Sequence, residues 1–319
     1  MKIRIISPAG HTEPDLIDRG AATLRSWGFD VDLSPNAKGR WGRYAATPPQ
    51  RAQDIIDALC DPTVNILWCS RGGYGSMQLL DRLPLDLIAH ARKPLVGYSD
   101  ITALHALWQK AGTPSVHAPM MRQLAEQPEH AATQKLRAAL LHYETALAAS
   151  GTGIASASAP LRTAKTTDAP WPQQNDLLRL SPHPLDILPE RHPSAPIVGG
   201  NLAVLSALHG TPYDFDYCGR ILFVEDVGES PYKIDRMMQT LRLSGTFDEI
   251  RGLIIGQFSG TDLYEDIPTD AAPGQPRLKG LLENIRDLLL PYGIPVRFGA
   301  PIGHVVDNHP VVEGAEFTL

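Results

Sequence analysis

Residues 94–102 read Pro-Leu-Val-Gly-Tyr-Ser-Asp-Ile-Thr, and this stretch decides the fold class. It opens with an apolar run short enough for a buried strand, and residues 101–110 carry apolar side chains at helical spacing. A strand that passes directly into a helix is the building unit of an α/β protein. The stretch therefore predicts a strand, a corner at Ser99 and a helix.

The same alternation extends toward the N-terminus. Short β-rich runs are each followed by a segment with helical spacing. The predicted strands are residues 2–6, 30–33, 64–69 and 94–98, and the predicted helices are residues 13–27, 50–59, 74–80 and 101–110. Because strands joined by helices form right-handed βαβ units, we expect an α/β N-terminal domain with a flavodoxin-like parallel sheet.

The chain changes character in its middle and then resumes the α/β pattern. Residues 151–196 are rich in Ala, Ser, Thr and Pro, which is typical of a linker or crossover. The later predicted strands are residues 220–224, 252–257, 296–298 and 316–319, and the later predicted helices are residues 201–209, 232–243 and 276–290. We therefore expect two domains, residues 1–150 and a mixed α/β, β-rich domain over 197–319, with the site in the cleft between them.

The composition of the 319 residues excludes several classes of protein. Apolar residues make up 43% and charged residues 20%, which is ordinary for a globular chain and unlike a disordered one. The net charge of −6 argues against a nucleic-acid partner, and no apolar run is long enough to cross a membrane. Because the first residues lack the apolar stretch of a signal peptide, we expect a cytoplasmic protein.

The three cysteines, Cys60, Cys69 and Cys218, have neither paired spacing nor a CxxC motif. A disulfide framework or a cysteine-rich zinc site is therefore not expected. Small side chains in a reducing compartment are the simpler interpretation.

Ser99 lies where a predicted strand meets the positive end of a helix dipole. This corner is similar to the nucleophile elbow G-x-S-x-G of hydrolases, although Ile101 stands in place of the second glycine. The alternative is that Ser99 or Asp100 caps the helix, and from this segment alone capping is favoured.

Residues 69–75, Cys-Ser-Arg-Gly-Gly-Tyr-Gly, follow another apolar strand. Consecutive glycine amides can form an anion-binding concavity, which would serve as an oxyanion hole, whereas the simpler alternative is a tight turn. The segment is neither a Walker loop nor a complete G-x-G-x-x-G, so no nucleotide cofactor is indicated.

Two later segments supply candidate partners for a serine. Glu225 ends the apolar strand of residues 221–224, and a carboxylate there is costly unless it is paired, for example with a histidine. His304 follows a turn rich in Gly and Pro, which can hold a base rigidly. A metal site on His304, Asp307 and His309 is the minor alternative. His105 and His117 are interpreted as core or pocket-wall residues.

Taken in order, these segments resemble the LD-carboxypeptidase family, serine peptidases of the muramoyl-tetrapeptide carboxypeptidase and microcin-immunity type. The resemblance covers almost the whole chain and rests on an ordered set of motifs. They are SPAG at 7–10, SRGGYG at 70–75, GYSD at 97–100, HAPM at 117–120, GGNL at 199–202, EDVGE at 225–229 followed by SPYKIDRM, and GAPIGH at 299–304.

The resemblance implies that Ser99 is the nucleophile, that His304 is the base and that Glu225 orients the base. The backbone amides of Gly73 and Asp100 would bind the oxyanion. The implied reaction is hydrolysis of an L,D-amide bond, which releases terminal D-alanine from murein tetrapeptide in cell-wall recycling. No cofactor or metal takes part, and the implied assembly is a homodimer.

Two further residues are candidates for substrate binding. Arg71 can grip a substrate carboxylate in a bidentate fork, or it can be an ordinary surface arginine. Asn201 can hydrogen-bond the peptide backbone, or it can cap the helix that it starts.

Two other functions remain open. In the microcin-immunity branch an aromatic residue on a longer loop holds a nucleotide, and Trp171 lies in the predicted linker. Because that linker has a low-complexity composition, the recycling enzyme is favoured over a hydrolase of microcin-C-type peptide-nucleotides. The remaining alternative is a ligand-binding α/β protein that keeps the cleft without a nucleophile.

Overall fold

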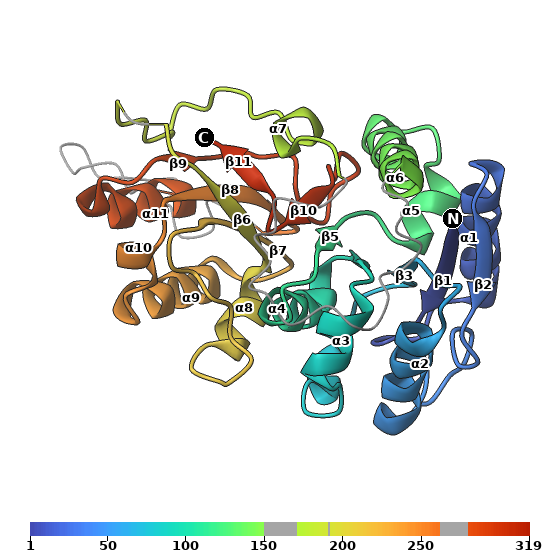
Figure 1. Ribbon diagram of the computed structural model, residues 1–319. Helices are drawn as coiled ribbons and strands as arrows, with labels where there is room; N and C mark the ends of the chain where they lie inside the picture. Colours follow the sequence, from blue (N-terminus) through green and yellow to red (C-terminus); the bar gives the residue numbers. More distant parts are fainter. Residues whose placement is uncertain (150–170, 191, 262–279) are drawn as a thin grey trace.

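The computed structural model describes residues 1–149, 171–190, 192–261 and 280–319 (Figure 1). Its first sheet has the strand order β10-β5-β4-β3-β1-β2. The first five strands are parallel: β1 (Lys2–Ile6), β2 (Asp30–Leu33), β3 (Ile66–Cys69), β4 (Leu95–Gly97) and β5 (Ser115–His117). Their order, 2-1-3-4-5, is that of flavodoxin-like proteins, so the predicted fold class of the N-terminal part is confirmed.

Helices cover both faces of this sheet because each carries an apolar stripe. In α1, Leu16, Ile17, Ala21 and Leu24 are buried, which is the spacing of one helix face. The N-terminal helices are α1 (Pro14–Ser26), α2 (Pro48–Cys60), the 3₁₀ turn η1 (Ser76–Leu79), α3 (Leu85–Ala91), the 3₁₀ turn η2 (Ser99–Ile101), α4 (Thr102–Lys110), α5 (Met121–Glu126) and α6 (Ala131–Ala149). The helix predicted over residues 74–80 was wrong in its length and type, because this stretch forms only the short turn η1.

The second sheet has the order β11-β6-β7-β8-β9. Its strands are β6 (Ser194–Asn201), β7 (Ile221–Val227), β8 (Gly252–Ser259), β9 (Val296–Arg297) and β11 (Glu316–Thr318), and only β11 is antiparallel to its neighbour. The helices of this half are α7 (Gln174–Leu177), α8 (Leu202–Leu208), α9 (Pro231–Leu243), α10 (Thr246–Glu249), α11 (Leu281–Leu289) and the 3₁₀ turn η4 (Leu290–Tyr292). The predicted mixed α/β class is confirmed here as well.

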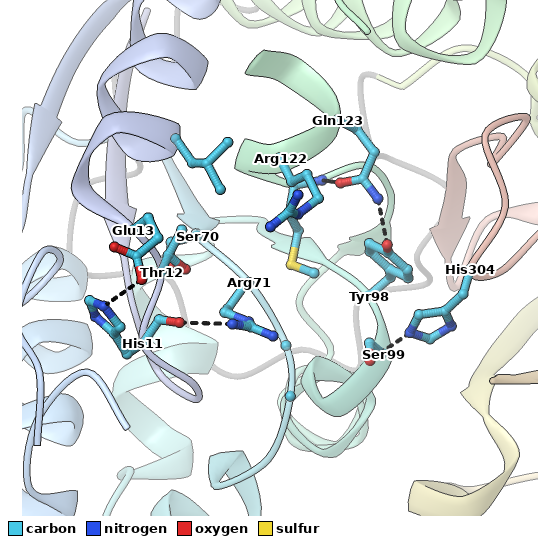
Figure 2. Close-up of a pocket in the computed structure, with 14 residues that line it drawn as sticks. His11, Thr12, Glu13, Ser70, Arg71, Tyr98, Ser99, Arg122, Gln123 and His304 are labelled. Carbon is cyan, nitrogen blue, oxygen red and sulfur yellow. Dashed lines mark hydrogen bonds and ion pairs between the residues drawn. The ribbon is translucent and has the colours of Figure 1, made fainter. Parts of the chain in front are cut away.

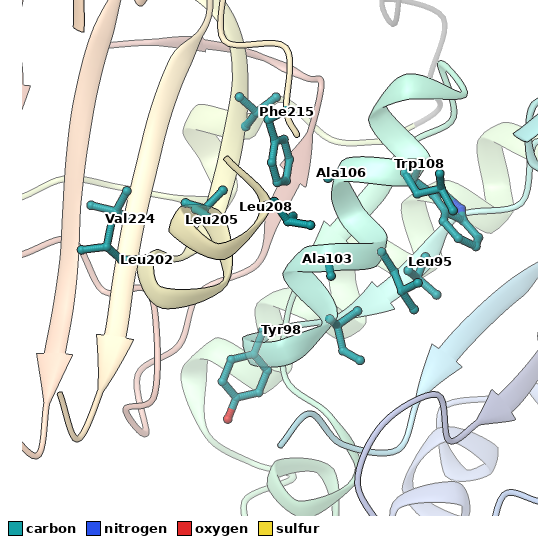
Figure 3. Packing of buried hydrophobic residues seen from close by; sticks show 14 of the residues in the cluster. Leu95, Tyr98, Ala103, Ala106, Trp108, Leu202, Leu205, Leu208, Phe215 and Val224 are labelled. Carbon is teal, nitrogen blue, oxygen red and sulfur yellow. The ribbon is translucent and has the colours of Figure 1, made fainter. Parts of the chain in front are cut away.

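One hydrophobic cluster contains residues of both halves of the chain. Figure 3 shows Ala103 and Ala106 of α4 on the side of that helix that faces Leu205 and Leu208 of α8. The backbones also come close, because the Asn201 N–H donates to Thr102 Oγ1 at 3.0 Å. Helix α4, which follows Ser99 in the chain, is thus fixed against the second half.

The last strand of the first sheet comes from the far end of the chain. β10 (Val311–Glu313) pairs antiparallel with β5, so that Val311 lies opposite His117. The segment between β9 and β10 therefore passes from one sheet to the other. That segment carries His304.

Part of the predicted linker, residues 151–196, is packed. Its first residues and the start of the helix predicted at 276–290 lie outside the described residues. Trp171 is buried and its ring lies 4.5 Å from that of Tyr143. The buried Gln174 side chain accepts a hydrogen bond from the Val312 N–H at 2.7 Å. This segment thus stabilises β10. The limits of the two domains remain a prediction.

Within the described ranges, no helix is both long and apolar enough to span a membrane.

Candidate active site

Ser99 occupies a strained corner at the carboxyl end of β4. Its φ is +68°, the left-handed region that a residue with a side chain seldom adopts. The neighbouring loop gives it room, because a Cβ on Gly72 would lie 2.8 Å from the Ser99 Cβ. The corner therefore projects a half-buried hydroxyl over the end of the sheet, as in a nucleophile elbow.

Neither polar residue at this corner caps α4, which was the alternative interpretation. The Asp100 carboxylate instead accepts the Ser76 N–H at 2.9 Å and so holds the neighbouring turn η1. Burial raises the pKa of Asp100, and the hydrogen bond from Ser76 opposes that shift.

His304 joins Ser99 to Glu225. Its Nε2 lies 2.9 Å from Ser99 Oγ, and its Nδ1 lies 2.8 Å from Glu225 Oε2. Because the carboxylate can only accept, Nδ1 carries the proton and Nε2 is left to accept from the serine hydroxyl. Figure 2 shows the His304 ring aimed at Ser99. The structure thus brings together the three side chains predicted as nucleophile, base and orienting carboxylate, although each comes from a different segment of the chain.

Glu225 reaches His304 from the interior of the second sheet. It lies on β7, is fully buried and stands at a shift of register between β7 and β8. Gly303, with a φ of +124°, precedes His304 and lies directly against this carboxylate. The close approach of Gly303 allows His304 to contact the Glu225 carboxylate, which has no surface exposed to solvent.

Two side chains beside His304, those of Tyr98 and His117, are uncharged at neutral pH. The Tyr98 ring lies 4.9 Å from that of His304, and burial raises the pKa of Tyr98 to about 12. Burial also lowers the pKa of His117 well below its usual value, and nearby His105 and His304 add to that shift. Of the imidazoles in this group, His304 lines the cavity in front of Ser99, whereas His105 and His117 are fully buried.

A cavity of about 310 Å³ opens in front of Ser99 and His304. Figure 2 shows Arg71 between the Ser99–His304 pair and the segment His11–Glu13. The exposed Arg71 guanidinium donates to the His11 carbonyl at 2.9 Å. The cavity is lined by His11, Thr12, Glu13, Leu16, Ser70, Arg71, Gly72, Gly73, Tyr98, Ser99, Met120, Arg122, Gln123 and His304.

The predicted oxyanion donors lie near Ser99. Gly73 lines the cavity, and Asp100 directly follows Ser99. Gly72 is the glycine that packs against Ser99, and its carbonyl accepts the Gly10 N–H at 3.0 Å, which fixes the loop. The roles of the Gly73 and Asp100 amides stay predictions.

Asn201 does not line this cavity. Its side-chain oxygen accepts the Val204 N–H at 3.2 Å, and its Nδ2 donates to Asp226 Oδ1 at 3.0 Å. Asn201 thus caps α8, which was one of the two interpretations of this residue. Both the oxygen and the nitrogen of its carboxamide therefore form hydrogen bonds within the protein.

The residues of the alternative metal site take part in two different sets of hydrogen bonds. His304 is engaged with Ser99 and Glu225, whereas His309 Nε2 lies 2.9 Å from Asp307 Oδ1. In the described part of the chain, no three His, Cys, Asp or Glu side chains converge as metal ligands would.

Several cavity residues were not found from the sequence. Gln123 donates to the Tyr98 hydroxyl, and Arg122 makes an ion pair with Glu126 at 3.0 Å. Thr12 contacts the buried Ser70 hydroxyl at 3.1 Å. The SPAG and HAPM motifs lie beside these residues, and their position at the ends of β1 and β5 was the available signal.

Comparison with known proteins decides the family. The model of the LD-carboxypeptidase N-terminal domain matches residues 3–118, and that of the C-terminal domain matches residues 194–319. A Synechocystis relative with a provisional carboxypeptidase name is 32% identical over 307 residues, 95% of this chain and 86% of the relative. The chain belongs to the LD-carboxypeptidase family. The resemblance found from the sequence motifs is thus confirmed.

Two further similar proteins extend the comparison. The murein tetrapeptide carboxypeptidase of Pseudomonas aeruginosa is 28% identical over 260 residues, 81% of this chain and 76% of that protein. The crystal structure of muramoyltetrapeptide carboxypeptidase from Oxalobacter formigenes has a TM-score of 0.75 and 27% identity, covering 100% of this chain and 94% of that one.

The LD-carboxypeptidase fold also matches the microcin C7 self immunity protein MccF in complex with aspartyl sulfamoyl adenosine. The TM-score is 0.72 over 100% of this chain and 92% of that chain, with 19% identity. At this identity the likeness shows the fold alone.

Proposed function

We propose that this chain is a serine LD-carboxypeptidase that hydrolyses the L,D-amide bond before the terminal D-alanine of murein tetrapeptide. The observation that carries the proposal is the pair of contacts made by His304, 2.9 Å to Ser99 Oγ and 2.8 Å to Glu225 Oε2. A ligand-binding protein without a nucleophile has no need of a strained serine in line with a base and a buried carboxylate.

In the proposed reaction, Ser99 Oγ attacks the carbonyl carbon of the amide while His304 Nε2 takes the hydroxyl proton. Glu225 holds the imidazole in the tautomer that accepts this proton and stabilises the imidazolium. The carbonyl oxygen becomes an oxyanion, bound by the backbone amides of Gly73 and Asp100. The C–N bond then breaks, and the imidazolium protonates the nitrogen of the leaving D-alanine.

A water molecule completes the cycle. His304 takes a proton from this water as it attacks the acyl-enzyme, and the proton returns to Ser99 Oγ when the ester bond breaks. Arg71 is assigned to the terminal carboxylate of the substrate, because its guanidinium faces the same cavity and can form a bidentate pair. Such a contact would select a free chain end.

We further propose that the enzyme acts in the cytoplasm as a homodimer, on recycled murein peptides. Cys60, Cys69 and Cys218 are all unpaired thiols, which suits a reducing compartment. The homodimer rests on the family resemblance.

Murein tetrapeptide incubated with the protein tests the reaction, with the products followed by mass spectrometry. Loss of one alanine is expected, and Ser99→Ala should abolish it whereas Ser26→Ala, an exposed serine on α1, should not. A tetrapeptide that ends in L-alanine should stay intact. An unchanged natural tetrapeptide refutes the proposal.

A peptide-nucleotide of the microcin C type serves as the competing substrate in the same assay. Trp171, the candidate for holding a nucleotide, is buried against Tyr143 and does not line the cavity. The peptide should therefore be the better substrate.

A further inference from the structure

The loop that carries His304 is closed by a buried asparagine. Asn308 is fully buried, and its Oδ1 accepts the Gly303 N–H at 3.0 Å. Because only an oxygen can accept from an N–H, this bond fixes which end of the carboxamide is Oδ1. The two Nδ2 protons of Asn308 are therefore left for another partner.

Two complementary polar atoms near this loop lack partners. Among the described residues, neither Asn308 Nδ2 nor Glu225 Oε1 has a hydrogen bond, and both atoms are buried. A buried charged oxygen without a donor is expensive, and so is a buried N–H without an acceptor. One of the two atoms is a donor and the other is an acceptor.

Gly303 brings the two residues together. It donates its N–H to Asn308, and a Cβ built on it would lie 2.7 Å from Glu225 Oε2. Asn308 and Glu225 are thus in contact with the same glycine, one residue before the base. A hydrogen bond between them, made directly or through one bound water, would satisfy both unpartnered atoms.

We propose that Asn308 is a positioning residue for Glu225, donating from Nδ2 to Glu225 Oε1 directly or through a single water. Glu225 Oε2 is then left to accept from His304, and the plane of the carboxylate is fixed at both oxygens. The inference rests on the proposed function, since the orientation of Glu225 matters only if His304 is the base. It adds a fourth side chain to the triad, from the same loop as the base.

The titratable and charged groups around Asn308, Glu225 and His304 could also influence a pH profile of Ser99 labelling. Tyr98 and His117 face His304 and are neutral near pH 7, and Asp226 follows Glu225 with its carboxylate bound to Asn201. At the far end of the loop, His309 contacts two charged groups, Lys135 at 3.0 Å and Asp307 at 2.9 Å.

The decisive variant is Asn308→Asp, measured by the rate at which a fluorophosphonate labels Ser99 between pH 5 and pH 9. Aspartate keeps an oxygen for the Gly303 N–H but replaces the Nδ2 donor by a second carboxylate oxygen. At pH 7 we expect labelling to slow at least about tenfold, with the acid limb moved to higher pH by about one unit. The limb moves because a carboxylate that has lost its donor binds the imidazolium more tightly.

Asn308→Ala removes the donor without adding a charge, and it should move the acid limb in the same direction by less. The matched control is Asp307→Asn, an exposed change one residue away, which should leave the profile unchanged. Thermal melting of each variant records whether it is folded. If Asn308→Asp is not folded, the Asn308→Ala profile decides.

The outcomes separate this inference from the proposed function. The inference is overturned if the folded Asn308 variants have the same acid limb as the unmodified protein, even if their labelling rates are lower. Labelling at Ser99 without release of D-alanine refutes the proposed substrate, while a shifted limb still supports the role of Asn308. If Ser99 of the unmodified protein is not labelled, both are refuted.

Discussion

Gly303 lies so close to Glu225 that a Cβ on the glycine would be 2.7 Å from Glu225 Oε2 and 3.0 Å from the Glu225 Cβ. The glycine also has a φ of +124°, so two independent constraints exclude a side chain at this position. Gly303, the residue before the proposed base His304, is thereby fixed against Glu225, the carboxylate proposed to orient it. The geometry of the proposed triad therefore depends on this contact.

Gly303→Ala should lower kcat for D-alanine release by about 100-fold, because a displacement of roughly 1 Å between Glu225 and His304 is enough for such a loss. It should also lower the free energy of unfolding by about 1–3 kcal/mol through backbone strain. Steady-state kinetics and urea denaturation measure the two effects. Gly293→Ala is the matched control, since Gly293 also has a positive φ but nothing within 4 Å of its Cβ position. Equal kcat values for the two variants would contradict the prediction.

Arg71→Lys should raise KM for the tetrapeptide about tenfold and leave kcat within a few-fold, because one charge-assisted hydrogen bond to the terminal carboxylate is lost. The same variant should show no change of KM on a tetrapeptide whose carboxyl end is amidated. Arg82→Lys, an exposed change outside the cavity, is the control. A KM that does not change with Arg71→Lys would remove this arginine from the substrate site.

Asn201→Ala should reduce the free energy of unfolding by about 1 kcal/mol, because the cap of α8 is lost. Urea denaturation measures this change. Ser230→Ala is the control, since Ser230 is the N-cap of α9 but makes no side-chain capping bond. An increase in KM at unchanged stability would instead favour the role of Asn201 in substrate binding.

His105 makes stability depend on pH on the acid side. It is fully buried, burial lowers its pKa from 6.5 to about 4, and its Nε2 donates to the Gly97 carbonyl at 2.9 Å. Because the folded-state pKa is depressed, the stabilisation is complete above pH 6.5 and is lost as the pH falls through the folded-state value. At about 1.36 kcal/mol per unit, the loss between these values is about 3 kcal/mol.

His105→Gln, which retains a donor for the Gly97 carbonyl, should lack this component. The measurement is the difference in unfolding free energy between the unmodified protein and the variant at several pH values, which cancels the other titrating groups. Glu313 Oε1 lies 3.7 Å from His105 Nδ1, so the series should be repeated in a Glu313→Gln background. A difference that does not vary between pH 7 and pH 4 would contradict the assignment.

Local signals predicted much of the fold. The short β-rich segments at residues 2–6 and 30–33 are strands with those limits, and α1 follows from the spacing of its apolar residues. These elements depend on contacts with near neighbours and on one buried face, which a periodic pattern encodes. The helix expected at 74–80 shortened to η1, because Gly73 and Gly75 adopt positive φ values that an α-helix cannot contain.

Other features depend on residues distant in the chain. Nothing in the sequence of residues 311–313 indicates that they form an edge strand beside β5, since that pairing is made with His117 and its neighbours. Trp171 lies in a segment of linker-like composition, and it is buried because it packs in a hydrophobic cluster that includes Tyr143. Arg122 and Gln123 reach the cavity because the end of β5 lies beside the end of β4.

By itself the sequence determined which chemistry was available: a serine at a strand-to-helix corner, a glutamate ending an apolar strand, and a histidine after a rigid turn. Each setting is local, because it depends on the residues immediately before and after. Only the tertiary structure decided that the three side chains meet. Ser99 and Glu225 are more than a hundred residues apart, at the end of a strand of the first sheet and on a strand of the second, and His304 lies in the segment that passes between the two sheets. Hydrogen-bond distances of 2.8 and 2.9 Å are set by how the sheets pack, through glycines that admit a close approach.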